Sequence, residues 1–429
     1  MEITVKPAEK IEGQIRMPGD KSISHRALLL SSLAEGPVDI EGILKAGDTL
    51  STLQCLKELG VEIEENGEKT RVKGRGLKGL EEPEDVLDAG NSATTVRLLT
   101  GLLAGQSFHS SLTGDNSLRK RPMNRVTDPL KKMGAFINGR QGSALLPLSI
   151  RGYDLLPISY ALPVASAQVK SALLIAALHS RGITEILDPF NTRDHTERAL
   201  RYLGADISNI KDHIVLRSPV RLKADKLYIP GDISAAAFFA VAVTLAPRGE
   251  LYIEDVGVNP TRTGILDVLN QMGAEINILN EKEYNCEPVA DLHVKGGREL
   301  KGVEITREMI PRLIDEIPVI AVAALFAEGD TVIKGASELR VKESDRLNTI
   351  TSELRKMGAD IQEFPDGLLI KGGNTVLSGA HCESHGDHRI AMALATAALF
   401  AADKTVIDGA DAADESFPEF FEVLNGTAT

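Results

Sequence analysis

The sequence has few cysteines, few aromatic residues and no long apolar run. Its three cysteines, Cys55, Cys286 and Cys382, are far apart and odd in number, so we expect neither a disulfide framework nor a closely spaced metal cluster. Aromatic residues make up 4% of the chain, and 61 acidic residues oppose 48 basic ones. This composition does not fit the positive surface and stacking platforms of a nucleic-acid-binding protein. With a net charge of −13, any anionic ligand must be held by local groups.

Membrane and export signals are missing as well. No apolar stretch reaches the length of about 18 residues that suggests a membrane-spanning helix. The opening segment MEITVKPAEK lacks the basic region and apolar stretch of a signal peptide. We therefore expect a cytoplasmic protein without a membrane partner. At 429 residues the chain is long enough for two domains, each with its own core.

One short phrase recurs along the chain. Leucine or methionine followed by glycine and a strand-like segment occurs at positions 59, 133, 203, 272 and 357, with a degenerate copy at 424. A spacing of about seventy residues indicates six structural repeats. Apolar residues recur at helical spacing before each phrase, as in Leu50, Leu53, Leu56 and Leu59. We expect the glycine to end each helix in the left-handed conformation, with a strand after it.

A second landmark is a helix-length segment that is apolar on nearly all sides. Examples are AQVKSALLIAALHSRG from position 167 and ISAAAFFAVAVTLAPRG from position 233. Such a helix is typical of one enclosed by protein on every side. Each repeat then has the order βαβαββ, with one interior and one amphipathic helix. The predicted fold is α/β, a two-domain inside-out α/β barrel with six βαβαββ repeats, three per domain.

The two halves of the chain match each other. The segment MPGDKS at 17–22 is echoed by IPGDIS at 229–234, which places the crossovers between domains at these points. We expect an N-terminal domain of residues 20–228 and a C-terminal domain of residues 1–19 plus 229–429. The opening strand EITVKP is expected to pack with the C-terminal domain.

Positive charge gathers where the interior helices begin. The segment GDKSISHR at 19–26 holds Lys21, His25 and Arg26, and Arg97 and Arg389 follow other helix starts. Asn, Ser and Asp at these starts are ordinary N-caps. The added cations oppose the helix dipole unless an anion lies between them. We therefore predict anion binding in addition to capping.

A second basic set lies in the loops before the amphipathic helices. Its members are Arg119, Lys120, Arg121, Arg193, Arg262, Lys342 and Arg346. Charged loops are usually just solvated, but recurrence in successive repeats favours a shared function. Arg forks suit carboxylates and phosphates. Together the two sets predict a cleft between the domains that binds a multiply anionic substrate.

Two acids stand out among these cations, Asp315 and Glu343. Each could be a simple counter-ion. As a pair they also have the chemistry of a general acid and base.

These motifs, taken in order along the whole chain, closely resemble the 5-enolpyruvylshikimate-3-phosphate synthase family. The matching segments are PGDKSISHR, GNSATTVRLL, RKRPM, PVASAQVKS, IDEIPV, LRVKESDRL, GDHRIAM and SFPEFF. The resemblance implies transfer of the enolpyruvyl group of phosphoenolpyruvate to the 5-hydroxyl of shikimate 3-phosphate, with release of phosphate. It implies two small-molecule substrates, a monomer, and no metal or organic cofactor.

The resemblance also assigns residues. The implied shikimate 3-phosphate contacts are Lys21, Ser22, Arg26, Ser166, Ala167, Gln168, Asp315 and Lys342. The implied phosphoenolpyruvate contacts are Lys21, Ala93, Arg121, Gln168, Arg346 and Arg389. Asp315 resembles the acceptor of the 5-hydroxyl proton, and Glu343 the group that protonates the methylene carbon. How the proton transfers divide among Lys21, Asp315 and Glu343 stays open at this level.

Two positions depart from the family pattern. Many members have glycine where this chain has Ala93, so a methyl group enters the wall of the phosphoenolpyruvate pocket, which predicts weak inhibition by glyphosate. Some members have a lysine that reaches phosphoenolpyruvate where this chain has Glu415. That contact is absent here.

Two other functions are alternatives. The related enzyme that transfers enolpyruvate to a UDP-activated amino sugar typically carries a loop cysteine near residue 115. Here that stretch reads LTGDNSLRKRP. A noncatalytic repeat protein that binds anions would not need Asp315 and Glu343 among the cations.

Overall fold

The glycine of each recurring phrase ends a helix. In the computed structural model, which describes residues 1–373 and 376–429, the φ angles of Gly60, Gly134, Gly204, Gly273 and Gly358 lie between 81° and 102°. Glycine adopts this left-handed region without the steric cost of a Cβ atom. A strand begins within three residues of each glycine, as the sequence predicts.

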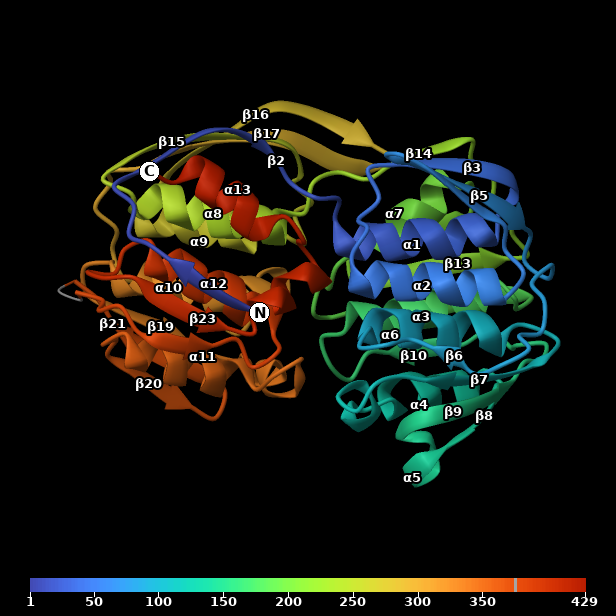
Figure 1. Cartoon of the computed structure of the whole chain (residues 1–429). Coiled ribbons are helices and arrows are strands. Elements are labelled where there is room, and N and C mark those ends of the chain that lie inside the picture. The colour runs from blue at the N-terminus through green and yellow to red at the C-terminus, as the bar shows by residue number, and fades with distance from the viewer. Residues whose placement is uncertain (374–375) are drawn as a thin grey trace. The chain divides into compact units, whose positions relative to one another are not determined.

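The chain folds into two compact units, both α/β (Figure 1). Unit 1 comprises Met1–Pro18, Gly231–Lys282 and Pro288–Thr429, and unit 2 comprises Gly19–Pro230 and Glu283–Glu287. The expected domain bounds need a correction, because Gly19, Ile229, Pro230 and Glu283–Glu287 belong to unit 2. Residues 283–287 comprise the end of one long strand, a turn and the start of the next strand, and a turn of this kind carries no signal of the body against which it packs.

Unit 2 holds three four-stranded sheets in the described part of the chain, in the orders β14-β3-β5-β4, β6-β7-β9-β8 and β10-β11-β13-β12. Its strands are β3 (Glu35–Glu41), β4 (Ile63–Asn66), β5 (Lys69–Arg75), β6 (Leu87–Asp88), β7 (His109–Thr113), β8 (Phe136–Gly139), β9 (Leu145–Arg151), β10 (Ser159–Ala161), β11 (Gly182–Leu187), β12 (Asp206–Ile210), β13 (His213–Ser218) and β14 (Lys226–Tyr228). Its helices are α1 (Lys21–Ser32), α2 (Gly47–Glu58), α3 (Ala93–Ala104), η1 (Leu118–Lys120), α4 (Asn124–Lys132), α5 (Arg140–Ser143), α6 (Ala167–Ala177) and α7 (His195–Tyr202).

Unit 1 holds two four-stranded sheets and one three-stranded sheet among its described residues, in the orders β16-β17-β15-β2, β18-β19-β21-β20 and β1-β23-β22. Its strands are β1 (Glu2–Val5), β2 (Lys10–Arg16), β15 (Arg248–Gly257), β16 (Glu275–Tyr284), β17 (Glu287–Lys295), β18 (Glu304–Ile305), β19 (Asp330–Ile333), β20 (Ile361–Phe364), β21 (Gly367–Lys371), β22 (His381–Glu383) and β23 (Thr405–Asp408). Its helices are α8 (Ile233–Leu245), α9 (Gly264–Met272), η2 (Ile310–Arg312), η3 (Ile314–Glu316), α10 (Ile317–Leu325), η4 (Ser337–Val341), α11 (Arg346–Lys356), α12 (His388–Ala398), η5 (Ala410–Glu415) and α13 (Phe420–Thr427).

The five four-stranded sheets of the described residues follow one plan. In β6-β7-β9-β8 the first two strands are parallel and joined through α3, and the last two form an antiparallel hairpin that follows α4. This is the predicted βαβαββ repeat. The first and fourth repeats take their first strand from elsewhere in the chain, since β14 pairs parallel with β3 and β2 pairs parallel with β15.

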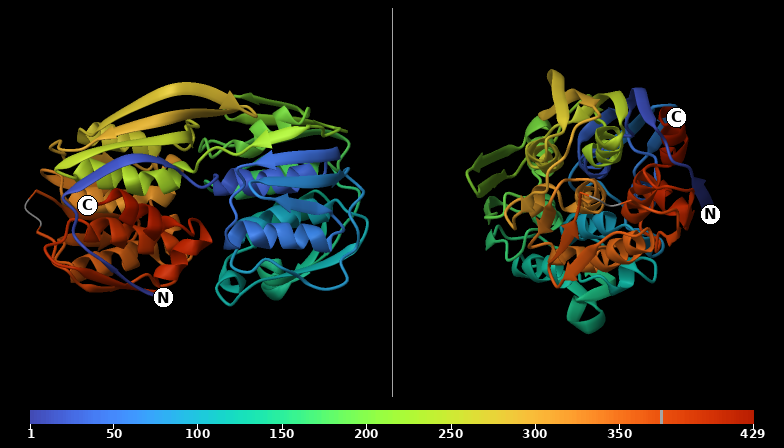
Figure 2. Two further views of the ribbon diagram at one scale, coloured as in Figure 1. Left: turned by 45° about the horizontal axis from the view of Figure 1, so that its top comes forward. Right: turned by 90° about the vertical axis from the view of Figure 1, so that its left-hand side faces the viewer.

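The sixth repeat is completed by the N-terminus. Strand β1 pairs antiparallel with β23, with Glu2 opposite Asp408 and Val5 opposite Thr405, so the opening strand packs in unit 1 as expected. Both termini lie in this unit (Figure 2). The degenerate phrase at 424 lies inside α13 instead of between a helix and a strand.

The interior helices are α1, α3 and α6 in unit 2 and α8, α10 and α12 in unit 1. Every residue of α8 except Leu245 is buried, and α10 is buried throughout. The amphipathic helices bury one face only. In α2 the predicted stripe is buried at Leu53, Leu56 and Leu59, whereas Leu50 in the first turn is exposed.

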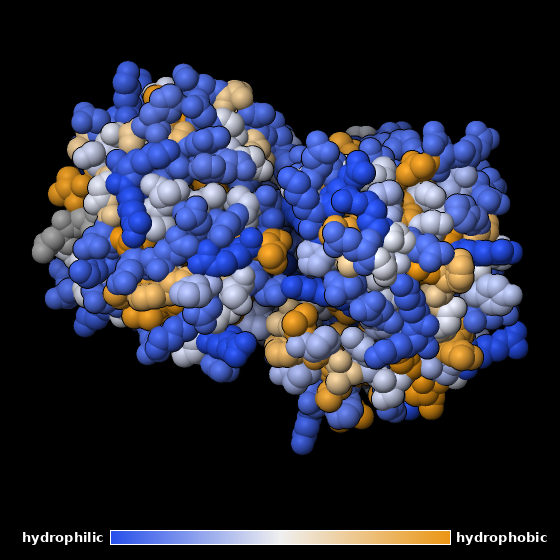
Figure 3. Space-filling view, turned by 90° about the horizontal axis from the view of Figure 1, so that it is seen from below, coloured by the Kyte–Doolittle hydropathy of each residue, from blue (hydrophilic) through white to orange (hydrophobic). Residues whose placement is uncertain are grey.

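The face of the molecule that Figure 3 shows is mostly polar. Figure 3 shows hydrophobic side chains on one face as small, separate patches among hydrophilic ones. In the part of the chain that the structure describes, no helix combines the length and apolarity needed to cross a bilayer.

Candidate active site

The three interior helices of unit 2 begin with ordinary N-caps. Asp20, Ser92 and Ser166 cap α1, α3 and α6, and each side chain accepts a hydrogen bond from the backbone N–H three residues later. This uses one of the free N–H groups at each helix start and leaves the others for a ligand. Ala93 and Ala167 are the first residues of α3 and α6.

Arg26 connects α1 to two other segments of unit 2. Its Nε donates to Thr196 Oγ1 at 2.7 Å and one Nη donates to Ser171 Oγ at 2.8 Å. Another Nη donates to the backbone oxygen of Ser22 at 2.8 Å. Burial lowers the pKa of Arg26 to about 10, against the opposing effect of Glu197, so the guanidinium stays charged at neutral pH.

Lys21 lies at the start of α1 and is paired within unit 2. Its Nζ is 2.8 Å from Asp48 Oδ2, and both side chains are largely buried. Asp48 lies in the first turn of α2. No pattern in the sequence pointed to Asp48.

His25 contributes no positive charge, contrary to its place in the basic segment. It is fully buried, and its Nδ1 is 2.7 Å from Thr52 Oγ1. Burial lowers the pKa of His25 to about 3, so the ring is neutral above that pH.

Gln168 joins the starts of α3 and α6. Its Nε2 donates to Thr94 Oγ1 at 2.9 Å, and its Oε1 accepts a hydrogen bond from Arg97. Arg97 also donates to the backbone oxygen of Pro122 at 3.2 Å. The loop before α4 thereby contacts Arg97, which is bound to Gln168.

The loop cations of unit 2 differ in their surroundings. Arg121 is buried and donates to Asn91 Oδ1 at 3.0 Å, just before α3. Lys120 is exposed to solvent. The helix starts of this unit thus bring together Lys21, Ser22, Arg26, Ala93, Arg121, Ser166, Ala167 and Gln168. We call these residues the unit 2 cluster.

Unit 1 has a second cluster, centred on Arg346. This guanidinium is 2% exposed and lies among three carboxylates. Its Nε and Nη2 donate to Asp387 at 2.8 and 3.1 Å, Nη1 donates to Asp315 at 3.2 Å, and Nη2 donates to Glu343 at 2.6 Å. Burial alone would lower the pKa of Arg346, but Asp387 and Glu343 raise it above its ordinary value.

Asp315 and Glu343 therefore meet at one cation. Lys342 Nζ is a second donor to Asp315 Oδ1, at 3.1 Å. Both acids are partly accessible, since their side chains are 14% and 22% exposed. Carboxylates held by cations and open to solvent can exchange protons with a bound ligand.

Arg389 lies in the first turn of α12, and Asp387 caps that helix by accepting its backbone N–H at 3.0 Å. The Arg389 guanidinium lies over the ring of Phe238, 6.0 Å from its centre. Its Nε is buried and has no hydrogen-bond partner among the described residues. We call Asp315, Lys342, Glu343, Arg346 and Arg389 the unit 1 cluster.

Arg262 does not belong to this cluster. It is buried and donates to Asp232 Oδ1 at 3.1 Å and Ser234 Oγ at 2.7 Å. Ser234 in turn donates to the buried Glu316. The charge of Arg262 is therefore balanced by Asp232 at the start of α8. In this repeat the loop cation forms a structural ion pair. Glu415 lies half-buried at the end of η5.

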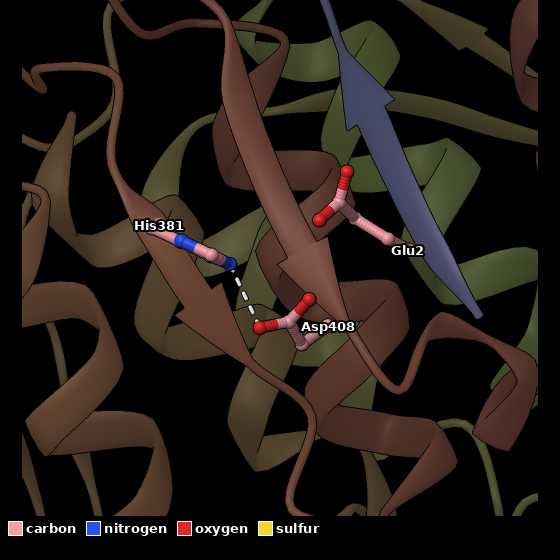
Figure 4. Close-up of side chains that lie close together, drawn as sticks. All are labelled: Glu2, His381 and Asp408. Carbon is pink, nitrogen blue, oxygen red and sulfur yellow. Dashed lines mark hydrogen bonds and ion pairs between the residues drawn. The ribbon is translucent and has the colours of Figure 1, made fainter.

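One set of potential metal ligands comes together away from both clusters. Glu2, His381 and Asp408 lie on the three strands of the β1-β23-β22 sheet, with ligand atoms within 4.8 Å of one another (Figure 4). His381 Nε2 is 2.7 Å from Asp408 Oδ2. Glu2 and His381 are exposed, and this set is separate from the predicted site residues.

Sequence reasoning missed the residues that hold the predicted ones. Asp387 was visible only as part of GDHR, and its side chain both caps α12 and binds Arg346. Thr196 and Ser171 bind Arg26 from distant repeats. Polar residues of this kind have no distinctive spacing, so a single sequence offers no signal for them.

Comparison with known proteins shows the family of the chain. The family model described as EPSP synthase (3-phosphoshikimate 1-carboxyvinyltransferase) matches residues 5–424. Relatives named 3-phosphoshikimate 1-carboxyvinyltransferase include those of Pelotomaculum thermopropionicum, 52% identical over 99% of this chain and 98% of the relative, and Geobacter metallireducens, 50% identical over 99% of both. A solved EPSP synthase structure from Acinetobacter baumannii superposes with a TM-score of 0.90 at 42% identity, covering 100% of this chain and 98% of that one. A family match over nearly the whole length, together with relatives at about half identity, leaves one conclusion: this chain belongs to the EPSP synthase family.

Proposed function

We propose that the protein is a 3-phosphoshikimate 1-carboxyvinyltransferase, which transfers the enolpyruvyl group of phosphoenolpyruvate to the 5-hydroxyl of shikimate 3-phosphate and releases phosphate. The product, 5-enolpyruvylshikimate 3-phosphate, leads to chorismate and the aromatic amino acids. The observation that carries this proposal is the unit 1 cluster, in which the buried Arg346 binds both Asp315 and Glu343.

The unit 2 cluster suits shikimate 3-phosphate. We assign Lys21, Ser22, Arg26, Ser166, Ala167 and Gln168 to this substrate. Lys21 and Arg26 supply charge, and the starts of α1 and α6 supply backbone N–H groups. Arg26 is supported by Thr196 and Ser171, so the guanidinium is already oriented before substrate binds. Asp315 and Lys342 of the unit 1 cluster are assigned to the same substrate.

Phosphoenolpyruvate carries a phosphate and a carboxylate, and arginine forks bind both groups well. We assign Arg121, Arg346 and Arg389 to these groups, with Lys21, Ala93 and Gln168 as further contacts. Arg346 has one Nη1 proton left after its four hydrogen bonds to described residues. The buried Nε of Arg389 is a second donor that an anion would satisfy.

The acids supply proton transfer. Asp315 takes the proton of the 5-hydroxyl of shikimate 3-phosphate as the hydroxyl oxygen attacks C2 of phosphoenolpyruvate. At the same time Glu343 protonates the methylene carbon C3. A tetrahedral intermediate results. The Glu343 carboxylate then takes a proton back from C3 as phosphate leaves C2, which restores the double bond. Lys21 is the third group assigned to proton transfer and charge stabilisation. No step requires a metal ion or organic cofactor.

A coupled assay tests the reaction directly. Purified protein is incubated with phosphoenolpyruvate and either shikimate 3-phosphate or a UDP-amino sugar, and released phosphate is measured. We expect release with shikimate 3-phosphate only. Release with the nucleotide sugar alone would assign the other transferase activity, and release with neither would leave an anion-binding repeat protein.

Replacing Ala93 with glycine should increase sensitivity to glyphosate. Ala93 is the first residue of α3 and is partly accessible, so its methyl group narrows the space beside the helix start. A methyl group in a rigid pocket discriminates close analogues by about 1 to 3 kcal/mol. We expect the inhibitory concentration of glyphosate to fall about tenfold or more in Ala93→Gly, measured at fixed phosphoenolpyruvate. An unchanged value would show that Ala93 does not set this selectivity.

We also propose that the protein acts in the cytoplasm as a monomer. A mass of 46.1 kDa in solution, measured by light scattering, is the expected result, and twice that mass would contradict it.

A further inference from the structure

Two side chains of helix α11 form hydrogen bonds with one short segment of unit 1. Arg346 is its first residue, and Glu353 lies seven residues later on the same face, since seven residues make about two helical turns. Both side chains are directed to the segment Glu383–Asp387, which joins β22 to α12. Arg346 holds the end of this segment and Glu353 holds its beginning.

The Arg346 end is part of the unit 1 cluster. The Asp387 carboxylate accepts hydrogen bonds from Nε and Nη2 of Arg346, and from the Ser344 hydroxyl at 3.0 Å. It also accepts the backbone N–H of Arg389. The position of Asp387 therefore determines both the orientation of the Arg346 guanidinium and the cap of the helix that carries Arg389.

The Glu353 end is a buried carboxylate with four hydrogen-bond partners among the described residues, one of which is the neighbouring Ser352 hydroxyl at 3.5 Å. Oε2 accepts the backbone N–H of Glu383 at 2.9 Å and the Lys356 ammonium at 2.7 Å. Oε1 lies 2.9 Å from His385 Nε2. The Glu353 side chain is 2% exposed, whereas that of His385 is 35% exposed.

His385 has an unfavourable backbone conformation. Its φ is 54° and that of the next residue, Gly386, is 68°. A left-handed conformation is common for glycine but uncommon for a histidine, and persists only when surrounding contacts hold it. The contact between His385 and Glu353 is such a contact, and it lies two residues before Asp387.

We propose that Glu353 and His385 are positioning residues for the phosphoenolpyruvate arginines. By fixing the left-handed turn at 385–386, their contact keeps Asp387 in the place where it orients Arg346 and caps the Arg389 helix. This inference rests on the proposed function and deepens it. Neither residue touches substrate. Their contact raises the fraction of free enzyme in which the arginines are ready to bind.

The informative variant is His385→Gly. Glycine removes the imidazole but tolerates a φ of 54°, so the backbone can keep its conformation at this position. We expect the thermal midpoint to stay within about 2 °C of the parent. The KM for phosphoenolpyruvate should rise about five- to tenfold, the size of coupling carried by residues remote from a ligand. The KM for shikimate 3-phosphate and kcat should stay within about twofold, because bound substrate itself holds the arginines.

A second variant and a matched control complete the test. Glu353→Gln keeps the shape and one acceptor oxygen, so we expect a smaller rise in the same KM, about two- to threefold. The double variant should raise the KM for phosphoenolpyruvate by less than the product of the two single effects, because His385→Gly and Glu353→Gln remove the same contact. Lys211→Gly changes another exposed residue with positive φ, 59°, at the tip of the β12–β13 hairpin in unit 2. It should leave all kinetic constants unchanged.

The outcomes separate this inference from the function on which it rests. A parent protein that releases no phosphate with shikimate 3-phosphate rejects the proposed function. An active parent whose KM for phosphoenolpyruvate is unaffected by His385→Gly rejects the positioning role alone. Equal rises in the KM of both substrates, or a fall in kcat alone, would mean general damage and would also reject it.

Discussion

Asp315→Asn is expected to lower kcat by about a hundred- to ten-thousandfold, the usual contribution of a general base. Asparagine keeps the size of the side chain, and its amide oxygen can still accept from Lys342 and Arg346, which donate to Asp315 at 3.1 and 3.2 Å. What is lost is the ability to take a proton. Because binding contacts are largely kept, both KM values should change by less than about fivefold. Steady-state phosphate release with each substrate varied measures all three constants.

A matched control separates this effect from loss of any carboxylate in unit 1. Asp291 on β17 accepts the Asp255 backbone N–H at 2.9 Å and the Asn280 amide at 2.8 Å, and it belongs to neither cluster. Asp291→Asn should retain parental kcat. If Asp315→Asn kept more than about a tenth of the activity, Asp315 would be a binding residue and the base would have to be another group.

Lys170→Met should destabilise unit 2 by about 3 to 5 kcal/mol, the usual cost of removing one partner of a buried ion pair. Lys170 is 2% exposed, and its Nζ lies 2.9 Å from Asp188 and 2.8 Å from Glu197, both buried. Burial raises the pKa of Glu197, and Lys170 opposes that rise. Urea unfolding followed by circular dichroism measures the change, since the loss should appear as a lower midpoint.

The double variant Lys170→Met with Glu197→Gln tests the cause. It removes one of the two buried negative charges together with the lysine, so about half of the lost stability should return. Lys57→Met is the matched control, because Lys57 makes only a partly exposed pair with Glu65 at 3.4 Å, and such pairs contribute about 1 kcal/mol or less. Equal losses from Lys170→Met and Lys57→Met would contradict the argument.

This ion pair also holds the loop before Arg193. Asp188 accepts the backbone N–H and hydroxyl of Thr192 at 3.0 and 2.6 Å, and Lys170 donates to the Thr192 carbonyl at 3.0 Å. The loop that leads to Arg193 is thus tied to α6, whose first turn begins beside Ser166. The backbone next to Arg193, one of the predicted loop cations, is therefore held at a defined place.

Much of the fold follows from local sequence. The glycine at the end of each amphipathic helix has a positive φ because a helix that stops there needs a residue without Cβ. Segments that are apolar all round become interior helices because no polar face is available for solvent. These effects act over a few neighbouring residues, so one sequence is enough to predict them.

The candidate residues follow from sequence in part. Lys21, Arg26 and Arg346 were predicted from their place at helix starts and in loops, and the structure brings them into two clusters. Arg262 occupied an equivalent repeat position but is bound to Asp232 and Ser234. His25 stood among cations but is neutral because it is buried. A repeat position therefore does not by itself distinguish a ligand-binding cation from a structural one.

The sequence by itself determined the repeat plan, the helix ends, the interior helices and the residue types available for an anion site. Only the tertiary structure decided which charges are neutralised and which remain for a ligand. Arg26 binds residues 145 and 170 positions away, and Arg346 binds Asp387, 41 positions away. Hydrogen bonds and burial at such separations depend on how the helices pack, and the pKa and orientation of a buried side chain depend on those neighbours and not on the adjacent sequence.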